Sequence, residues 1–260
     1  MKQYVVDVFT ETVFHGNPTA VCFVEDWPDD EVLRQIAGEN RLSETAFVRK
    51  KDGQYSLRWF TAVQEIPLCG HAALGAAWVV LRFCEPGASS VTFDTLSGPL
   101  TVEKEGNRCA MKLPGWTLRE IPVTAEMEAA IGTRPAAAYL GRDLLCVVDS
   151  GEALRAAAPD MERVKALPGL LLNLTAAGTD CDCLCRSFAP KLGVPEDPAC
   201  GSGQCHAFVY WAEVLGKREL FGRQASERGG EVYGRMEADG IRLSGASVLF
   251  SRAEILPGGC

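Results

Sequence analysis

Glu65-Ile66-Pro67-Leu68-Cys69-Gly70 and Glu196-Asp197-Pro198-Ala199-Cys200-Gly201 share the pattern Glu-x-Pro-x-Cys-Gly. Upstream, Arg58-Trp59-Phe60-Thr61 is echoed by Arg186-Ser187-Phe188-Ala189, and downstream each hexapeptide leads into an apolar helical run, over 72–81 and 205–215. The repeat predicts a duplicated chain with one Cys-Gly at a helix start in each half. Such a protein can place two acid/base groups on opposite faces of one ligand, which suits moving a proton on carbon.

The composition is that of a globular protein with room for two cores. The chain has 260 residues, of which 47% are hydrophobic, enough for two lobes of about 100 to 150 residues. Its net charge of −8 comes from dispersed acids, and no basic stripe is present, so we expect no nucleic-acid partner. No apolar run reaches the roughly 18 to 20 residues of a membrane span and no signal peptide is recognisable, so we expect a cytoplasmic protein with no membrane partner.

Eleven cysteines in such a chain are expected to be reduced thiols. The run Cys181-Asp182-Cys183-Leu184-Cys185 suggests a metal site, but alternation places its cysteines on one face of a strand and no nearby histidine supplies a fourth ligand. We therefore predict buried thiols and no metal there. The chain also lacks a dinucleotide-binding or Walker fingerprint, which predicts that no cofactor is bound.

Periodicity predicts an α+β fold in which each half is mostly strands with one long apolar helix. Further helices are expected over 29–39, 125–131 and 151–166, and a final hairpin turns at Asp239-Gly240. A helix that is apolar on all sides has to be buried, so we expect a curved antiparallel sheet wrapped around each central helix.

Each Cys-Gly helix start is a candidate carboxylate site, because free backbone N–H groups and the helix dipole favour an anion there. Gly201-Ser202-Gly203 lets a ligand approach the backbone closely, and Gly70, Gly201 and Ser202 are candidate substrate-binding residues. The same field is expected to lower the pKa of Cys69 and Cys200, so that one thiolate removes a proton while the opposite thiol returns one. The alternative is two buried cysteines at tight turns.

Three other residues are candidates. Glu44 directly precedes an apolar strand and is either a solvated edge acid or a general acid/base in an apolar pocket. His71 either orients a carboxylate or caps its helix. Asp197 either positions the substrate or only stabilises the helix dipole, and His206, inside the second helix, is expected to be packed.

The chain resembles the PhzF-like (phenazine biosynthesis) isomerase family, within the diaminopimelate epimerase-like superfamily. The resemblance rests on motifs in the family's order: Asp7-Val8-Phe9, Phe14-His15-Gly16-Asn17-Pro18, Leu42-Ser43-Glu44-Thr45-Ala46-Phe47, Pro67-Leu68-Cys69-Gly70-His71-Ala72, Glu196 to Ser202, and Arg228-Gly229-Gly230. It implies two pseudo-symmetric lobes, residues 1–115 and 116–246, with a tail at 247–260 that returns to the first lobe. It also implies a site in the cleft between the lobes and a homodimer.

By matched position, the family's proton-shuttling glutamate falls on Glu44, and its supporting residues fall on His71, Asp197 and Ser202. The paired cysteines of the related epimerases and racemases fall on Cys69 and Cys200. The chain departs from the PhzF-like pattern at Cys200, where threonine is common. Asn17 and the two helix-start glycines complete the predicted substrate-binding set.

The leading hypothesis is a cofactor-independent isomerase that shifts a proton on a small carboxylate-bearing metabolite, with Glu44 as acid/base. The alternatives are a two-thiol amino-acid racemase or epimerase using Cys69 and Cys200, and a binding protein that retains the fold. A redox switch through a Cys69–Cys200 disulfide is a weaker alternative.

Overall fold

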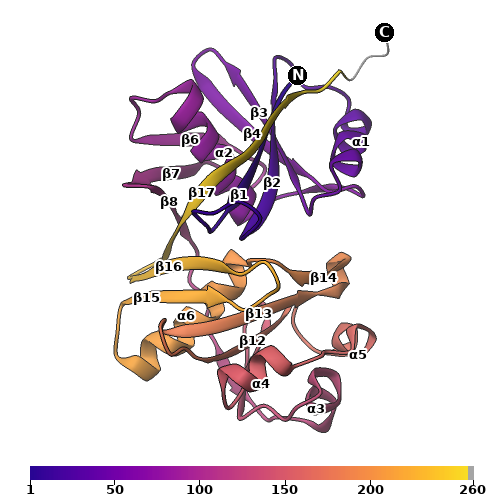
Figure 1. Cartoon of the computed structure of the whole chain (residues 1–260), viewed down its shortest axis with the longest axis vertical. Coiled ribbons are helices and arrows are strands. Elements are labelled where there is room, and N and C mark those ends of the chain that lie inside the picture. The colour runs from indigo at the N-terminus through magenta and orange to yellow at the C-terminus, as the bar shows by residue number, and fades with distance from the viewer. Residues whose placement is uncertain (257–260) are drawn as a thin grey trace. The chain divides into compact units, whose positions relative to one another are not determined.

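The protein is described by a computed structural model that covers residues 1–256. The chain divides into two compact units: unit 1 is Met1–Lys112 with Ser244–Cys260, and unit 2 is Leu113–Leu243 (Figure 1). Residues 257–260, the end of the predicted tail, lie outside the described residues. No helix among residues 1–256 is both long and apolar enough to cross a membrane.

Unit 1 is built on one curved sheet. Its strands are β1 (Lys2–Val8), β2 (Asn17–Val24), β3 (Thr45–Lys51), β4 (Gln54–Phe60), β5 (Glu65–Ile66), β6 (Ser90–Asp94), β7 (Leu100–Glu105), β8 (Arg108–Leu113) and most of β17 (Gly240–Glu254). The pairs β17/β1, β1/β2, β3/β4, β4/β5, β6/β7 and β7/β8 are antiparallel, whereas β2/β3 and β4/β6 are parallel. The mixed pairing follows from the helices that connect β2 to β3 and β5 to β6.

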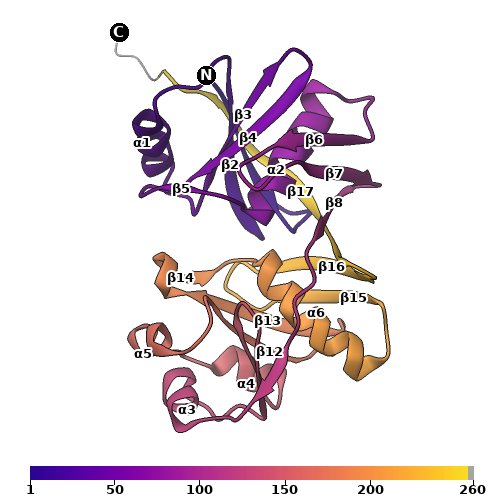
Figure 2. The same ribbon diagram turned by 180° about the vertical axis from the view of Figure 1, so that it is seen from behind.

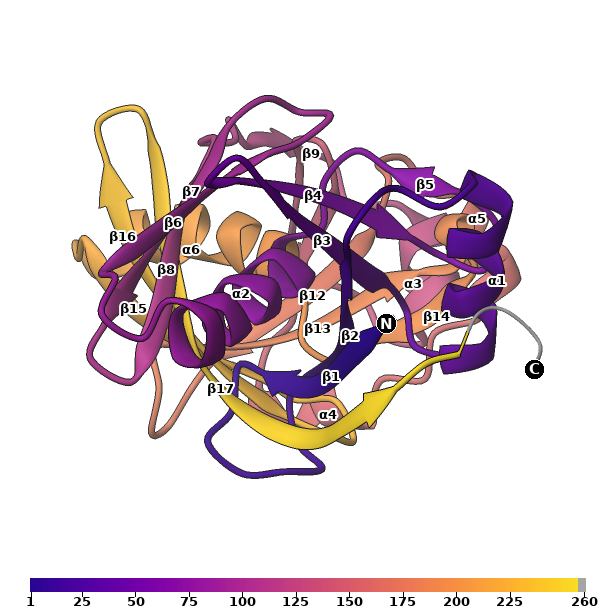
Figure 3. The ribbon, with the colours of Figure 1, turned by 90° about the horizontal axis from the view of Figure 1, so that it is seen from above.

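The helix α2 (Gly70–Val79) forms the core of unit 1. Every residue from His71 to Ala77 is buried, and the helix contacts β1, β2, β3 and β7, so the sheet curves around it (Figure 3). The helix begins two residues before the predicted range and continues as a π-helical segment, η1 (Val80–Cys84). Its start therefore lies directly at the Cys-Gly of the first hexapeptide.

Unit 2 repeats the same pairing pattern. Its strands are β9 (Arg119–Ile121), β10 (Ala137–Leu140), β11 (Leu144–Val147), β12 (Leu172–Ala177), β13 (Cys183–Ala189), β14 (Val194–Asp197), β15 (Glu219–Gln224) and β16 (Gly230–Glu237), with η2 (Pro190–Leu192) before β14. The pairs β9/β10, β10/β11, β12/β13, β13/β14 and β15/β16 are antiparallel, whereas β11/β12 and β13/β15 are parallel. The order from β10 to β16 thus matches the order from β1 to β7.

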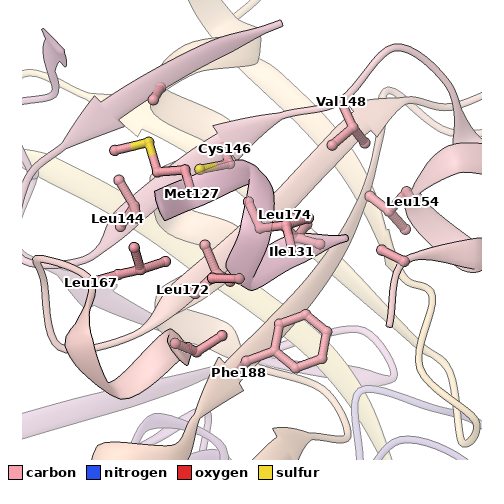
Figure 4. Close-up of a cluster of buried hydrophobic side chains, with 14 of the residues drawn as sticks. Met127, Ile131, Leu144, Cys146, Val148, Leu154, Leu167, Leu172, Leu174 and Phe188 are labelled. Carbon is pink, nitrogen blue, oxygen red and sulfur yellow. The ribbon is translucent and has the colours of Figure 1, made fainter. Parts of the chain in front are cut away.

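The central helix of unit 2 is α6 (Gly201–Leu215), which contacts β12, β13, β15 and β16 (Figure 2). Asn173 and Thr175 of β12 face this helix. Leu172 and Leu174, which alternate with them, point to the opposite face and join a hydrophobic cluster with α3 (Ala125–Ile131), α4 (Gly151–Ala156) and α5 (Met161–Ala166) (Figure 4). The sheet is therefore covered on both faces.

In unit 1, one helix covers the outer face of the sheet. Helix α1 (Asp30–Asn40) packs Leu33 and Ile36 against Cys22, Phe47 and Phe60 of the sheet. The 3.6-residue spacing of these apolar positions is the reason the helix could be read from the sequence.

Two local predictions differ from the structure. The single helix expected over 151–166 is two helices, because Pro159 interrupts it and the Asp160 side chain then caps α5 by accepting the Glu162 and Arg163 N–H groups. In the cysteine-rich run, Cys183 and Cys185 are buried in β13, but Cys181 precedes the strand and is half-buried.

Candidate active site

Each hexapeptide is tied to its sheet by the same ion pair. Arg58 of β4 binds Glu65 through Nε–Oε1 and Nη2–Oε2 contacts of 2.7 Å each. Arg186 of β13 binds Glu196 in the same way, at 2.8 and 2.9 Å. Bidentate pairs of this kind fix direction as well as distance. The repeated arginine and glutamate therefore hold the short strand that leads into each Cys-Gly.

In unit 1, Asn17, Glu44, Cys69 and His71 converge at the start of α2, and we call this group the first half-site. His71 Nε2 lies 3.4 Å from Glu44 Oε2. On the other edge of the ring, His71 Nδ1 lies 3.3 Å from Asn17 Nδ2 and 3.5 Å from Cys69 Sγ. The imidazole thus separates a carboxylate from a thiol.

The half-site is shielded from water. The side chains of His71 and Glu44 are 6% and 16% exposed. Glu44 Oε2 and His71 Nε2 are both buried, and neither atom has a hydrogen bond among residues 1–256. The Thr19 hydroxyl fixes the backbone by donating to the Glu44 carbonyl at 3.2 Å. These two atoms of a buried acid and base are therefore available to a ligand.

Glu44, Cys69 and His71 could also be considered as metal ligands, since their donor atoms lie within 4.8 Å of one another. However, the two ring nitrogens face different partners: Nε2 faces Glu44 and Nδ1 faces Cys69. Glu44 and Cys69 therefore contact opposite edges of the imidazole, each facing a nitrogen that can carry or accept a proton. The arrangement suits proton transfer better than metal binding.

In unit 2, Asp197, Cys200 and Ser202 lie at the start of α6. Cys200 is the N-cap of the helix: its Sγ accepts the Gly203 N–H at 3.4 Å and lies 3.5 Å from Ser202 Oγ. The Asp197 carboxylate accepts the Ala199 N–H at 3.1 Å, which shapes the turn before the helix. We call these three residues the second half-site, together with Arg142, which donates to Ser202 Oγ.

The electrostatics of Cys200 differ from the sequence-based expectation. Burial, and secondarily the charge of Asp197, raise the pKa of the Cys200 thiol well above its usual value. The expected lowering by the helix dipole is therefore wrong for this residue, because the side chain is only 4% exposed and desolvation opposes the thiolate. Burial therefore favours the protonated form of the Cys200 thiol.

Arg142 was not found from the sequence. It follows β10, and its Nη2 donates to Ser202 Oγ at 2.8 Å while Nε and Nη2 bind the buried Asp143 carboxylate at 3.0 and 2.6 Å. His206, one helical turn after Ser202, is packed as expected, but it also bonds the Ser202 carbonyl through Nδ1 at 2.8 Å and accepts the Asp143 N–H through Nε2 at 3.3 Å. A single arginine in a turn carries no sequence signal for such a network.

Residues 6–253 match the model of the phenazine biosynthesis-like protein family, PhzC-PhzF. The chain belongs to this family.

A Pseudomonas aeruginosa protein named as an uncharacterized isomerase is 41% identical over 249 residues, covering 94% of this chain and 95% of the relative. A crystal structure of a PhzF-family protein from Enterococcus faecalis has a TM-score of 0.95 at 39% identity and covers 98% of each chain. A probable proline racemase from Agrobacterium radiobacter shares the fold, with a TM-score of 0.70 at 12% identity over 98% of this chain and 92% of the other. The predicted family and its epimerase-like α+β fold are thus confirmed.

Within this PhzF-family chain, the predicted site residues fall into two groups. Asn17, Glu44, Cys69 and His71 meet in unit 1, where Gly70 is the first residue of α2. Asp197, Cys200 and Ser202 meet in unit 2, where Gly201 is the first residue of α6.

Proposed function

We propose that this PhzF-family protein is an isomerase that moves a proton between carbons of a small carboxylate-bearing metabolite without a cofactor. One observation carries the proposal: Glu44 Oε2 and His71 Nε2 lie 3.4 Å apart, both screened from water and both without hydrogen bonds among residues 1–256. The isomerase names of relatives such as the Pseudomonas aeruginosa protein support it, and they favour an enzyme over a binding protein that keeps the fold.

In this mechanism, Glu44 is the base. Its carboxylate takes a proton from one carbon of the substrate, the electron pair of that C–H bond moves through the adjacent unsaturated system, and the protonated Glu44 returns the proton to another carbon. No atom or electron is lost. His71, whose Nε2 lies 3.4 Å from Glu44 Oε2, positions the carboxylate, while the burial of both side chains keeps water from exchanging the proton.

We further propose that the second half-site binds the same substrate as the first half-site, as the family resemblance implies. The start of α6 and Ser202 would receive the carboxylate, and Asp197 would position the rest of the molecule. Cys200, a neutral thiol, is suited to giving a proton and not to removing one.

The two-thiol racemase remains the second candidate because of one contact: Cys69 Sγ lies 3.5 Å from His71 Nδ1, the geometry of a thiol beside its own base. In that case Cys69 would be the base and Cys200 the acid. A racemase also needs the reverse reaction, in which Cys200 would be the base, and the raised pKa of Cys200 opposes that role.

The test is to incubate the reduced protein in D2O with a pool of amino acids and small cyclic carboxylates, and to look by mass spectrometry for one-unit gains at carbon. We expect a gain that Glu44→Gln abolishes and that the exposed control Glu39→Gln leaves unchanged. Retention of the gain in Glu44→Gln, with loss in Cys69→Ser and Cys200→Ser, would replace the isomerase by the racemase. Cys205→Ser, in the same helix as Cys200, is the control for the thiols.

Three further predictions accompany this proposal. We expect lobes at residues 1–115 and 116–246 with the 247–260 tail on the first lobe, a homodimer, and a cytoplasmic location. The matching strand pairings of the two units support the first of these. Analytical ultracentrifugation of the purified protein checks the dimer.

A further inference from the structure

We infer that Arg142 is the residue that recognises the carboxylate group of the ligand, at the start of α6 in unit 2. The ligand class is a small organic carboxylate. Only the identification of this ligand with the substrate rests on the proposed function; the anion site itself rests on the contacts of Arg142.

The guanidinium of Arg142 is held in one orientation before any ligand arrives. The fully buried Asp143 carboxylate binds its Nε and Nη2, and Nη2 also reaches Ser202 Oγ at 2.8 Å. The Trp116 ring lies against its plane, with Cζ 5.3 Å from the ring centroid. A fixed arginine binds a carboxylate with little further loss of side-chain entropy.

One end of the guanidinium is left for a ligand. Nη1 makes no hydrogen bond to any residue in 1–256, and the side chain is 38% exposed. Nη1 therefore offers two N–H donors outward, away from the Asp143 pair. Because Nε and both N–H groups of Nη2 are already used, a carboxylate would bind Arg142 through Nη1 by a charge-assisted hydrogen bond.

The Asp143 and Asp197 carboxylates both oppose a negative charge near Cys200, so the distance of a ligand from them decides whether an anion binds. Asp143 is bound by Nε and Nη2, so a ligand on Nη1 is closer to the guanidinium than to that carboxylate, and attraction falls with distance. Asn173 Nδ2 approaches Asp143 Oδ2 at 3.4 Å and helps to satisfy its charge. The N–H groups at the start of α6 add a favourable partial charge.

Ser202 connects Arg142 to the Cys200 thiol. Its Oγ lies 2.8 Å from Arg142 Nη2 and 3.5 Å from Cys200 Sγ. A carboxylate bound to Arg142 and Ser202 thus places its neighbouring carbon beside the thiol. Arg142 would select ligands that carry a carboxylate, and Glu44 would still move the proton.

Trp116 provides a direct probe of binding. It stacks on His206 with ring centroids 4.8 Å apart and lies against Arg142, so an anion on the guanidinium changes its surroundings. We would label the full chain with 5-fluorotryptophan, assign the Trp116 19F signal with Trp116→Phe, and titrate benzoate and its uncharged analogue benzamide at constant ionic strength. We expect benzoate, but not benzamide, to shift the Trp116 signal.

The variants decide whether Arg142 is responsible. Arg142→Gln should weaken benzoate binding about tenfold or more, since a charged hydrogen bond is lost, and Arg163→Gln, on the surface of unit 2, should leave it unchanged. Arg142→Lys keeps the charge and should bind with intermediate affinity, which a purely structural role would not produce. Thermal melting of each variant shows whether unit 2 remains folded.

Several outcomes would overturn the inference: no shift with benzoate, an equal shift with benzamide, or unchanged affinity in a folded Arg142→Gln or Arg142→Lys protein. The deuterium experiment separates this site from the proposed reaction. If benzoate binds through Arg142 but no compound gains deuterium, the anion site stands and the isomerase proposal fails. If deuterium exchange occurs with unchanged KM in Arg142→Gln, the isomerase stands and the identification of this ligand with the substrate fails.

Discussion

The two half-sites share a frame, the backbone and ion pair that lead into each central helix, and differ in the side chains at the helix start. Both begin with a bidentate Arg–Glu pair, then a proline, then a cysteine that precedes the central helix. In unit 1 the histidine stands two residues after the cysteine, at His71, and the glycine Gly75 stands six after it. In unit 2 the serine Ser202 stands two after and the histidine His206 six after.

This exchange of positions has a packing reason. A Cβ on Gly75 would come within 2.6 Å of Thr19 Cγ2, so the helix of unit 1 approaches its sheet too closely for a side chain there. In unit 2 the same position carries His206, which binds Asp143 and stacks on Trp116. The comparison teaches that two units with the same pairing of strands and the same Arg–Glu pair carry different side chains at equivalent helix positions, which we propose serve proton transfer in unit 1 and anion binding in unit 2.

The largest expected effect tests the assignment of the base to unit 1. Glu44→Gln should lower the rate of deuterium incorporation by about 100-fold or more, the usual range for a lost general base. Cys200→Ser should reduce the rate less, because Ser keeps a proton donor at the N-cap. Rates measured by mass spectrometry give the order, and a larger loss in Cys200→Ser would reverse the roles of the two units.

The next prediction concerns the shared frame. Replacing either arginine leaves a partly buried glutamate without its partner, so Arg58→Gln should lower the free energy of unfolding by about 2 kcal/mol. Arg186→Gln should cost more, because Arg186 Nη1 also donates to the Leu154 and Ala157 carbonyls at 3.1 and 2.7 Å. Urea unfolding of both variants checks this order; equal losses would mean that these extra bonds contribute no more than the 2.8 Å bond from Arg58 Nη2 to Asp30 Oδ1.

A pH titration distinguishes the histidine of unit 2. Burial, the largest effect, lowers the pKa of His206 despite the nearby Asp143 carboxylate, while Arg142 acts in the same direction as burial. The unfolded chain therefore binds a proton more readily, and stability should fall as the pH drops through about 6.5, by less than about 1.4 kcal/mol per pH unit. Chemical unfolding between pH 7.5 and 5.5 measures the slope, which His206→Gln should reduce and the exposed control His15→Gln should not.

The smallest effect concerns thiol reactivity. Cys84 is exposed, whereas Cys69 and Cys200 are buried and the pKa of Cys200 is raised. Iodoacetamide at neutral pH should therefore label Cys84 first and Cys200 slowly, as read by peptide mass mapping. Fast labelling of Cys200 would show that it is a thiolate and would support the two-thiol racemase instead.

The sequence was sufficient wherever the information is local or repeated. The two hexapeptides located both helix starts, and apolar spacing located α1 and α3. The strand after Glu44 was equally clear, because β3 begins with the apolar residues Ala46, Phe47 and Val48. These features depend on periodicity, turn residues and the repeat, which a single chain displays directly.

The network around Arg142 could not be predicted, because it joins residues from three separate segments of unit 2. The pKa of Cys200 was predicted in the wrong direction for a related reason. The helix start can be read from the sequence, but the burial that outweighs its dipole depends on tertiary packing. Pro159 marks the break between α4 and α5 in the sequence. The break was nevertheless missed, because apolar residues continue at helical spacing on both sides of it.

The cap of α6 has an evolutionary consequence. A helix N-cap needs only a side-chain acceptor for the N–H three residues on, and Cys200 Sγ fills that role for Gly203. A hydroxyl of serine or threonine fills it equally well, so this position can change between thiol and alcohol with little cost to folding. One nucleotide separates cysteine and serine codons, and such lineages could pass between proton-relay and two-thiol chemistry without rebuilding the protein.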